Sequence, residues 1–251
     1  MTKLILCFFL CMLLITVQAF AGAGPSPFIS IFSCDGSSPK EIDEDICLVG
    51  VLKEGLPVYL LSDEVLCQAE TREAVMLERE VGAEFMMTPV EWDGCDNADY
   101  YLAYRGRQPK NFESLEFEEE DSAAIRTSVD TAVRNGHLTA AMNNTFAGTL
   151  KSEPLLYKPF AKRSDMFLAQ YATSRPSKED DVYGPLFWYA KGSVKLIDAQ
   201  ARIAAVFRID GRLYFMLQHE CWDGCGEYTE KVYSLSEKGF VLVYQNSALS
   251  E

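Results

Sequence analysis

The chain has 251 residues, with 37 acidic and 23 basic side chains and a formal net charge of −14 at pH 7. A surface with this balance repels nucleic acid and anionic lipid headgroups, so the composition argues against partners of either kind. Hydrophobic residues make up 48% of the chain and aromatic residues 12%, which supports a sizeable core and argues against global disorder.

The amino-terminal segment is typical of a secretory signal peptide. Lys3 is the only charged residue before an apolar run of 14 residues from Leu4 to Val17, and Ala19-Phe20-Ala21 forms a small-x-small cleavage pattern. The run is shorter than the roughly 20 apolar residues that a spanning helix needs. We therefore expect residues 1–21 to be removed near Ala21, leaving a secreted or periplasmic product with no membrane span in the mature chain.

Negative charge is concentrated in the first half of the expected mature chain. Residues 22–121 hold 23 acidic and 7 basic side chains, whereas residues 122–251 hold 14 and 15. Such a surface favours basic proteins, cationic peptides or metal cations, although acids on a solvated face also serve solubility alone. We expect an acidic β-rich module over 22–112, an acidic linker over 113–121, and a helix with antiparallel strands over 122–251. The two modules can form one compact domain.

Short strands separated by turns are expected in the acidic module. The candidate strands are Phe28–Phe32, Cys47–Lys53, Pro57–Leu61, Glu84–Val90 and Tyr100–Tyr104. The second and third of these flank a connection that contains Gly55, which predicts that they pair as a hairpin.

The clearest helix pattern follows the acidic linker. Apolar residues recur with helical spacing at Ile125, Val129, Ala132 and Val133. Ser122 or Asp121 can cap the start, and Asn135-Gly136 is a typical helix stop. The pattern predicts one amphipathic helix near residues 122–135.

Two hairpins are expected near the carboxyl end. Strands at Ile203–Ile209 and Leu213–His219 flank Asp210-Gly211, a pair that tolerates the positive φ angles of a two-residue turn. Tyr228–Leu235 and Phe240–Tyr244 form the second hairpin, which together with the first suggests a meander of three or four strands. The whole pattern predicts an α+β fold of predominantly antiparallel strands, with an all-β barrel or a pair of sandwiches as the alternative.

An even number of cysteines follows the signal peptide. The six are Cys34, Cys47, Cys67, Cys95, Cys221 and Cys225. In an exported chain they predict three disulfides, and short separations favour the pairs Cys34–Cys47, Cys67–Cys95 and Cys221–Cys225. His219 beside Cys221 and Cys225 is a poor zinc signature, so we predict no metal at these residues.

A four-residue motif occurs twice, as Trp92-Asp93-Gly94-Cys95 and as Trp222-Asp223-Gly224-Cys225. Tight-turn chemistry explains both copies, because Asp-Gly forms turns, Cys bridges and Trp packs against them. The functional interpretation makes this region a binding site, with candidate residues Trp92, Asp93, Asp96, Asp99, Trp222 and Asp223. The acids with Asn97 are oxygen ligands of the kind that calcium prefers, but their spacing does not fit an EF-hand loop. We predict no cofactor, with calcium as the alternative.

Catalytic motifs are missing from the sequence. His137 and His219 are its only histidines, and it contains no Gly-x-Ser-x-Gly, His-Glu-x-x-His or Walker motif. These absences, together with the concentration of acids in the first half of the mature chain, favour an exported, non-enzymatic protein that binds a cationic partner such as a basic protein. One alternative is a carbohydrate-active enzyme or sugar-binding protein that stacks sugars on Tyr183, Phe187, Trp188 and Tyr189. The other is a structural, envelope-associated protein.

Overall fold

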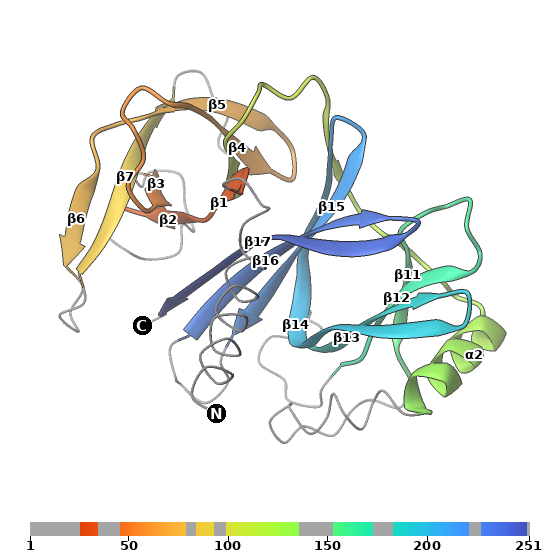
Figure 1. The fold of residues 1–251 in the computed structure, drawn as a ribbon. Helices are drawn as coiled ribbons and strands as arrows, with labels where there is room; N and C mark the ends of the chain where they lie inside the picture. The colour runs from red at the N-terminus through yellow and green to blue at the C-terminus, as the bar shows by residue number, and fades with distance from the viewer. Residues whose placement is uncertain are drawn as a thin grey trace, which may run out of the picture.

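The computed structural model describes residues 26–34, 46–78, 84–92, 99–135, 153–172, 183–220 and 227–249. These residues form two antiparallel sheets and one amphipathic helix, which confirms the predicted fold class (Figure 1). The segment expected to be a signal peptide lies outside the described residues. Within the ranges above, no helix is long and apolar enough to cross a membrane.

The first sheet has eight strands. They are β1 (Phe28–Ile29), β2 (Ile31–Ser33), β3 (Ile46–Val49), β4 (Pro57–Ser62), β5 (Leu66–Thr71), β6 (Val75–Glu78), β7 (Glu84–Trp92) and β8 (Tyr100–Tyr104). Their order is β1-β8-β4-β5-β7-β3-β2, and β6 pairs with β7. Only Ser30 separates β1 at one end of this order from β2 at the other, so the sheet curls into a nearly closed barrel (Figure 1).

The predicted hairpin around Gly55 is wrong. β3 pairs with β2 and β7, whereas β4 pairs with β5 and β8. The connection between β3 and β4 is held by two buried threonines of other strands. Thr88 Oγ1 donates to the carbonyl of Gly50 at 2.8 Å, and Thr71 Oγ1 donates to the carbonyl of Lys53 at 2.7 Å. Bonds to residues far along the chain therefore replace the expected local pairing.

The second sheet has nine strands. They are β9 (Phe112–Leu115), β10 (Glu118–Glu119), β11 (Leu155–Lys158), β12 (Met166–Gln170), β13 (Gly184–Ala190), β14 (Ser193–Ile209), β15 (Arg212–Glu220), β16 (Glu227–Ser236) and β17 (Gly239–Leu249). Their order is β10-β11-β12-β13-β14-β15-β16-β17, with β9 beside β14. The acidic stretch 113–121 thus contributes to two strands of this sheet.

Both predicted carboxyl-terminal hairpins are confirmed. Asp210 and Gly211 turn between β14 and β15 with φ angles of 48° and 79°, as a two-residue hairpin turn requires. Ser236 and Gly239 pair at the end of the β16–β17 hairpin. The four strands β14 to β17 form the expected meander.

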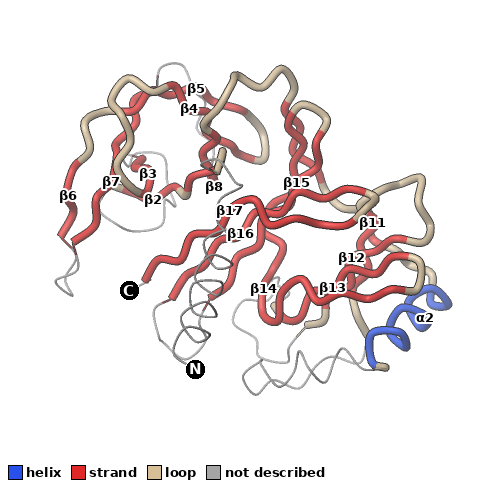
Figure 2. Tube along the Cα trace, viewed as in Figure 1, coloured by secondary structure: helices blue, strands red, loops and turns tan. Residues whose placement is uncertain are grey.

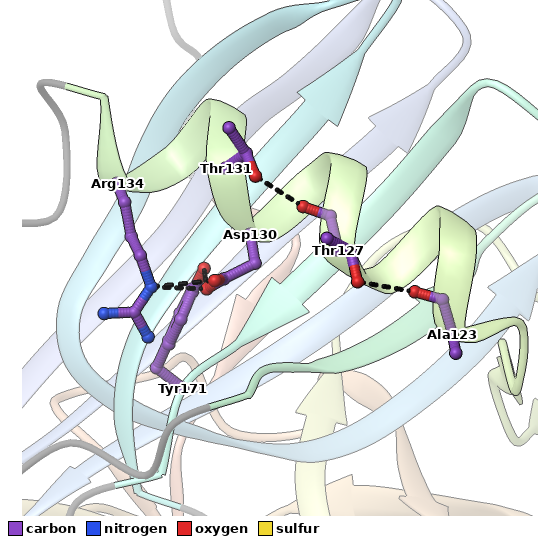
Figure 3. A network of polar contacts seen from close by, with 6 residues as sticks. All are labelled: Ala123, Thr127, Asp130, Thr131, Arg134 and Tyr171. Atoms are coloured by element: carbon purple, nitrogen blue, oxygen red, sulfur yellow. Dashed lines mark hydrogen bonds and ion pairs between the residues drawn. The ribbon is translucent and has the colours of Figure 1, made fainter.

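Helix α2 (Ala123–Arg134) covers β11, β12 and β13 at the end of the molecule away from the first sheet (Figure 2). The amide of Ile125 donates to the Ser122 side chain, which confirms that residue as the N-cap. Val129 and Val133 are buried against the sheet, as their spacing predicts. Figure 3 shows a polar contact of the same helix, in which Asp130 accepts a hydrogen bond from the buried hydroxyl of Tyr171.

The two sheets share a hydrophobic core. Phe28 and Leu61 of the first sheet pack in one buried cluster with Phe207 and Tyr214 of the second. The Phe28 ring lies 5.2 Å from that of Tyr214 and 5.9 Å from that of Phe207 between centroids, with both pairs edge-on. Contacts of this kind fix the position of the two sheets relative to each other. Side chains next to both sheets can therefore line one pocket.

Candidate functional site

The candidate residues of the repeated motif are only partly described. Asp93, Asp96, Trp222 and Asp223 lie outside the described residues. Trp92 ends β7 and packs, half-buried, against the core of the first sheet, whereas Asp99 is exposed just before β8. Strands β4 and β5 lie between β7 and β8, so the sheet does not place these two residues on neighbouring strands. A binding role for the motif stays a prediction.

The cysteines form one complete disulfide among the described residues. Cys34 and Cys47 are bonded, with their Cα atoms 5.0 Å apart, which confirms this predicted pair. Cys47 lies opposite Phe32 in the β2–β3 ladder. Cys34 comes two residues after Phe32, just beyond the end of β2. Cys67 is also disulfide-bonded, to a partner that is not among the described residues. The pairs Cys67–Cys95 and Cys221–Cys225 stay predictions, since Cys95, Cys221 and Cys225 lie outside the described ranges.

The aromatic residues considered for sugar stacking belong mainly to the core. Tyr183, Phe187 and Trp188 are exposed by 4%, 0% and 4%, and Tyr189 is half-buried. Trp188 packs in the cluster beneath β14 and β15, and Phe187 packs under helix α2. The rings of Tyr183, Phe187 and Trp188 are therefore too buried for a sugar to stack on them.

A different region, which sequence reasoning missed, forms a pocket of about 580 Å³. We call it the β14 pocket. Its lining residues come from the first sheet, from β9 and the chain after it, from β11 and from β14. They are Asp63, Ser114, Leu115, Glu116, Phe117, Tyr157, Ile203, Ala204, Ala205 and Val206.

The pocket lies where one edge of β14 changes partners. β13 pairs with β14 as far as Ala201, and β9 pairs with it from Val206 onward. β9 and β15 pair with the same residues of β14, so they lie on opposite edges of that strand. The sheet order places β13 and β15 on either side of β14, so β13 and β9 share the edge away from β15. Strand β9 ends at Leu115, and the chain then turns away from β14 and continues to β10. This leaves a gap beside Ile203–Ala205.

A β-bulge in β14 coincides with this gap. Ile203 lies opposite Leu217 and Ala205 opposite Met216, so Ala204 is an extra residue in the ladder with β15. Bulges bend a strand and are common beside functional sites. Here the extra residue is Ala204, and both it and the neighbouring Ala205 have small side chains.

The charged groups that line the pocket are acidic. Asp63 and Glu116 contribute exposed carboxylates, and Ser114 donates a long hydrogen bond of 3.4 Å to Asp63 Oδ1. The described lining contains no lysine, arginine or histidine. Tyr157 adds a phenol whose pKa is raised, chiefly by burial and also by Glu119. The remaining lining residues are apolar, so the pocket combines apolar side chains with negative charge.

Tyr101 of β8 lies next to this region. Its ring centroid is 6.1 Å from that of Phe207, which pairs with Ser114 of the pocket wall. The Tyr101 hydroxyl is buried and has no hydrogen-bond partner among the described residues. Burial, and then the charge of Asp63, raise the pKa of Tyr101 far above its ordinary value, so the phenol stays neutral.

No local sequence signal marks the β14 pocket. Asp63 belongs to a turn, and Glu116 belongs to the stretch 113–121, which the sequence predicts to be an acidic linker. The pocket offers carboxylates, hydroxyls and apolar surface, a combination suited to binding a cation that carries hydrocarbon. Comparisons with models of protein families, with curated proteins and with solved structures find no match to this chain.

Proposed function

We propose that this chain is an exported, non-enzymatic binding protein that holds a cationic partner in the β14 pocket. One observation carries the proposal: the charged groups lining the pocket, Asp63 and Glu116, are both carboxylates, and they line it together with apolar side chains. Lysine and arginine side chains match such a site, because they combine a hydrocarbon stem with a charged tip.

The charge of the whole chain supports the same proposal. With a net charge of −14, the protein attracts cations over distances longer than a contact, which raises the rate of encounter with a basic partner. This attraction weakens with salt, since charges separated by more than the Debye length of about 10 Å at 0.1 M are screened.

The proposal is tested by titrating the protein with butylammonium and, as an uncharged match, 1-butanol. Amide resonances of residues 114–117 and 203–206 should shift with butylammonium far more than with the alcohol. The response should weaken as salt is added.

Variants test whether the two carboxylates are responsible. Asp63→Asn and Glu116→Gln should each weaken butylammonium binding by up to about fivefold, the upper end of the range for exposed ion pairs. Glu73→Gln is the matched control, an exposed acid outside the pocket, and it should bind as the parent does. Equal responses to the amine and the alcohol would refute the proposal.

A further inference from the structure

We infer that the cationic partner binds as a short extended peptide segment, which pairs with Ile203–Ala205 of β14 and directs a lysine or arginine toward Asp63 and Glu116. The inference rests on the proposed function, because it specifies the form in which the pocket receives its cation.

The first argument is the gap along β14. Between the last pair with β13 at Ala201 and the first pair with β9 at Val206, no described strand pairs with Ile203–Ala205 on that edge. Backbone N–H and C=O groups need hydrogen-bond partners, and an extended peptide supplies both in the pattern of a strand. At about 3.3 Å per residue, the stretch spans about 10 Å and takes a segment of about three residues.

The second argument is the space beside this edge. The pocket of about 580 Å³ lies directly on the three residues and continues over Val206. Their side chains include two alanines, and the bulge at Ala204 bends the strand. A peptide backbone can therefore approach β14 without displacing a large side chain.

The third argument is charge complementarity. Side chains of an extended segment alternate between two faces, so a basic residue that faces the acids has neighbours that face away. Asp63 follows β4 of the first sheet, whereas Glu116 follows β9 of the second. Carboxylates next to strands of both sheets thus line the same pocket as Ile203–Ala205, which favours a basic segment over a neutral or acidic one.

The test uses the protein expressed from its full sequence and the peptide acetyl-Val-Lys-Val-Lys-Val-amide. Isothermal titration compares this peptide with five versions, each carrying one N-methyl group on a different backbone amide. In a paired strand only every second amide of the peptide faces β14. We expect N-methylation of an amide that pairs with Ile203–Ala205 to weaken binding by about three- to tenfold, the loss of one hydrogen bond, while methylation of the amides on either side of it leaves binding nearly unchanged.

A matched peptide with Glu in place of both Lys residues should not bind. The double variant Asp63→Asn, Glu116→Gln should weaken binding of the basic peptide, while the control Glu73→Gln does not. If butylammonium binds but N-methylation shows no alternating pattern, the extended-segment inference is overturned and the proposed function stands. If neither butylammonium nor the basic peptide binds, the proposed function fails and the inference fails with it.

Discussion

The backbone N–H of Ser30, between β1 and β2, donates a hydrogen bond of 2.7 Å to the hydroxyl of Tyr244 on β17. The Ser30 hydroxyl contacts the same Tyr244 oxygen at 2.8 Å, donates to the buried carboxylate of Glu230 and accepts from Asn246 Nδ2 at 3.1 Å. A polar cluster therefore joins the two sheets beside their shared hydrophobic core. Each bond in it removes the cost of burying a polar group.

Tyr244→Phe should lower the free energy of unfolding by about 1–3 kcal/mol, because it leaves the buried Ser30 N–H without its acceptor. Urea denaturation measures the change. Tyr101→Phe is the matched control, since it removes a buried hydroxyl that has no described partner, and it should leave stability unchanged or raise it. Equal losses in the two variants would contradict the role assigned to the Tyr244 hydroxyl.

Stability should fall as pH rises above about 10. Burial raises the pKa of Tyr233 and of Tyr244 to about 12, from an ordinary value of 10.0. A group whose pKa is raised by folding contributes stability that is complete below its unfolded pKa and lost as pH rises through its folded pKa. Urea midpoints at pH 9, 10, 11 and 12 should therefore decline between pH 10 and 12, and less steeply in Tyr244→Phe. A flat profile over that interval would contradict the prediction.

The Cys34–Cys47 disulfide should contribute about 3 kcal/mol to the free energy of unfolding, as expected for a crosslink between residues 13 apart. The double variant Cys34→Ser, Cys47→Ser removes it without leaving a free thiol at either position. Thermal and urea unfolding of this variant should show the loss, while adding reductant should destabilise it less than it does the parent chain. An unchanged midpoint would show that the bond adds nothing.

Asp130→Ala should destabilise the protein by about 1–3 kcal/mol. Asp130 accepts a hydrogen bond of 2.8 Å from the buried hydroxyl of Tyr171 and pairs with Arg134 at 2.8 Å (Figure 3). The exposed ion pair alone is expected to add only about 0.3–0.5 kcal/mol, so Arg134→Ala is the control that separates the two contributions. Similar losses in both variants would assign the effect to the ion pair instead.

Local signals in the sequence predicted the elements whose partners are near in the chain. Asp210-Gly211 carries its turn geometry in its own residue types, and Val129 and Val133 reveal the buried face of the helix by spacing alone. The pairing of β3 with β2 and β7 was not predicted, because bonds from Thr71 and Thr88 overrode the glycine-containing connection beside it.

The β14 pocket escaped prediction for a related physical reason. The pocket depends on where β9 and β13 stop pairing along β14. It also depends on the turn after β4 of the first sheet, which supplies Asp63. None of these positions carries a residue pattern that differs from an ordinary strand or turn. Relations of this kind arise only when segments far apart in the chain have folded together.

Ser30 separates β1 from β2, the strands at the two ends of the first sheet. It is also hydrogen-bonded to β16 and β17 of the second sheet. Separating β1 from β2 at this residue would thus break hydrogen bonds to the β16–β17 hairpin. Unfolding that hairpin would in turn remove the hydrogen bonds that hold Ser30 between β1 and β2. The sheets should therefore melt in one cooperative transition, with amides of β2 and β16 exchanging their hydrogens through the same global event.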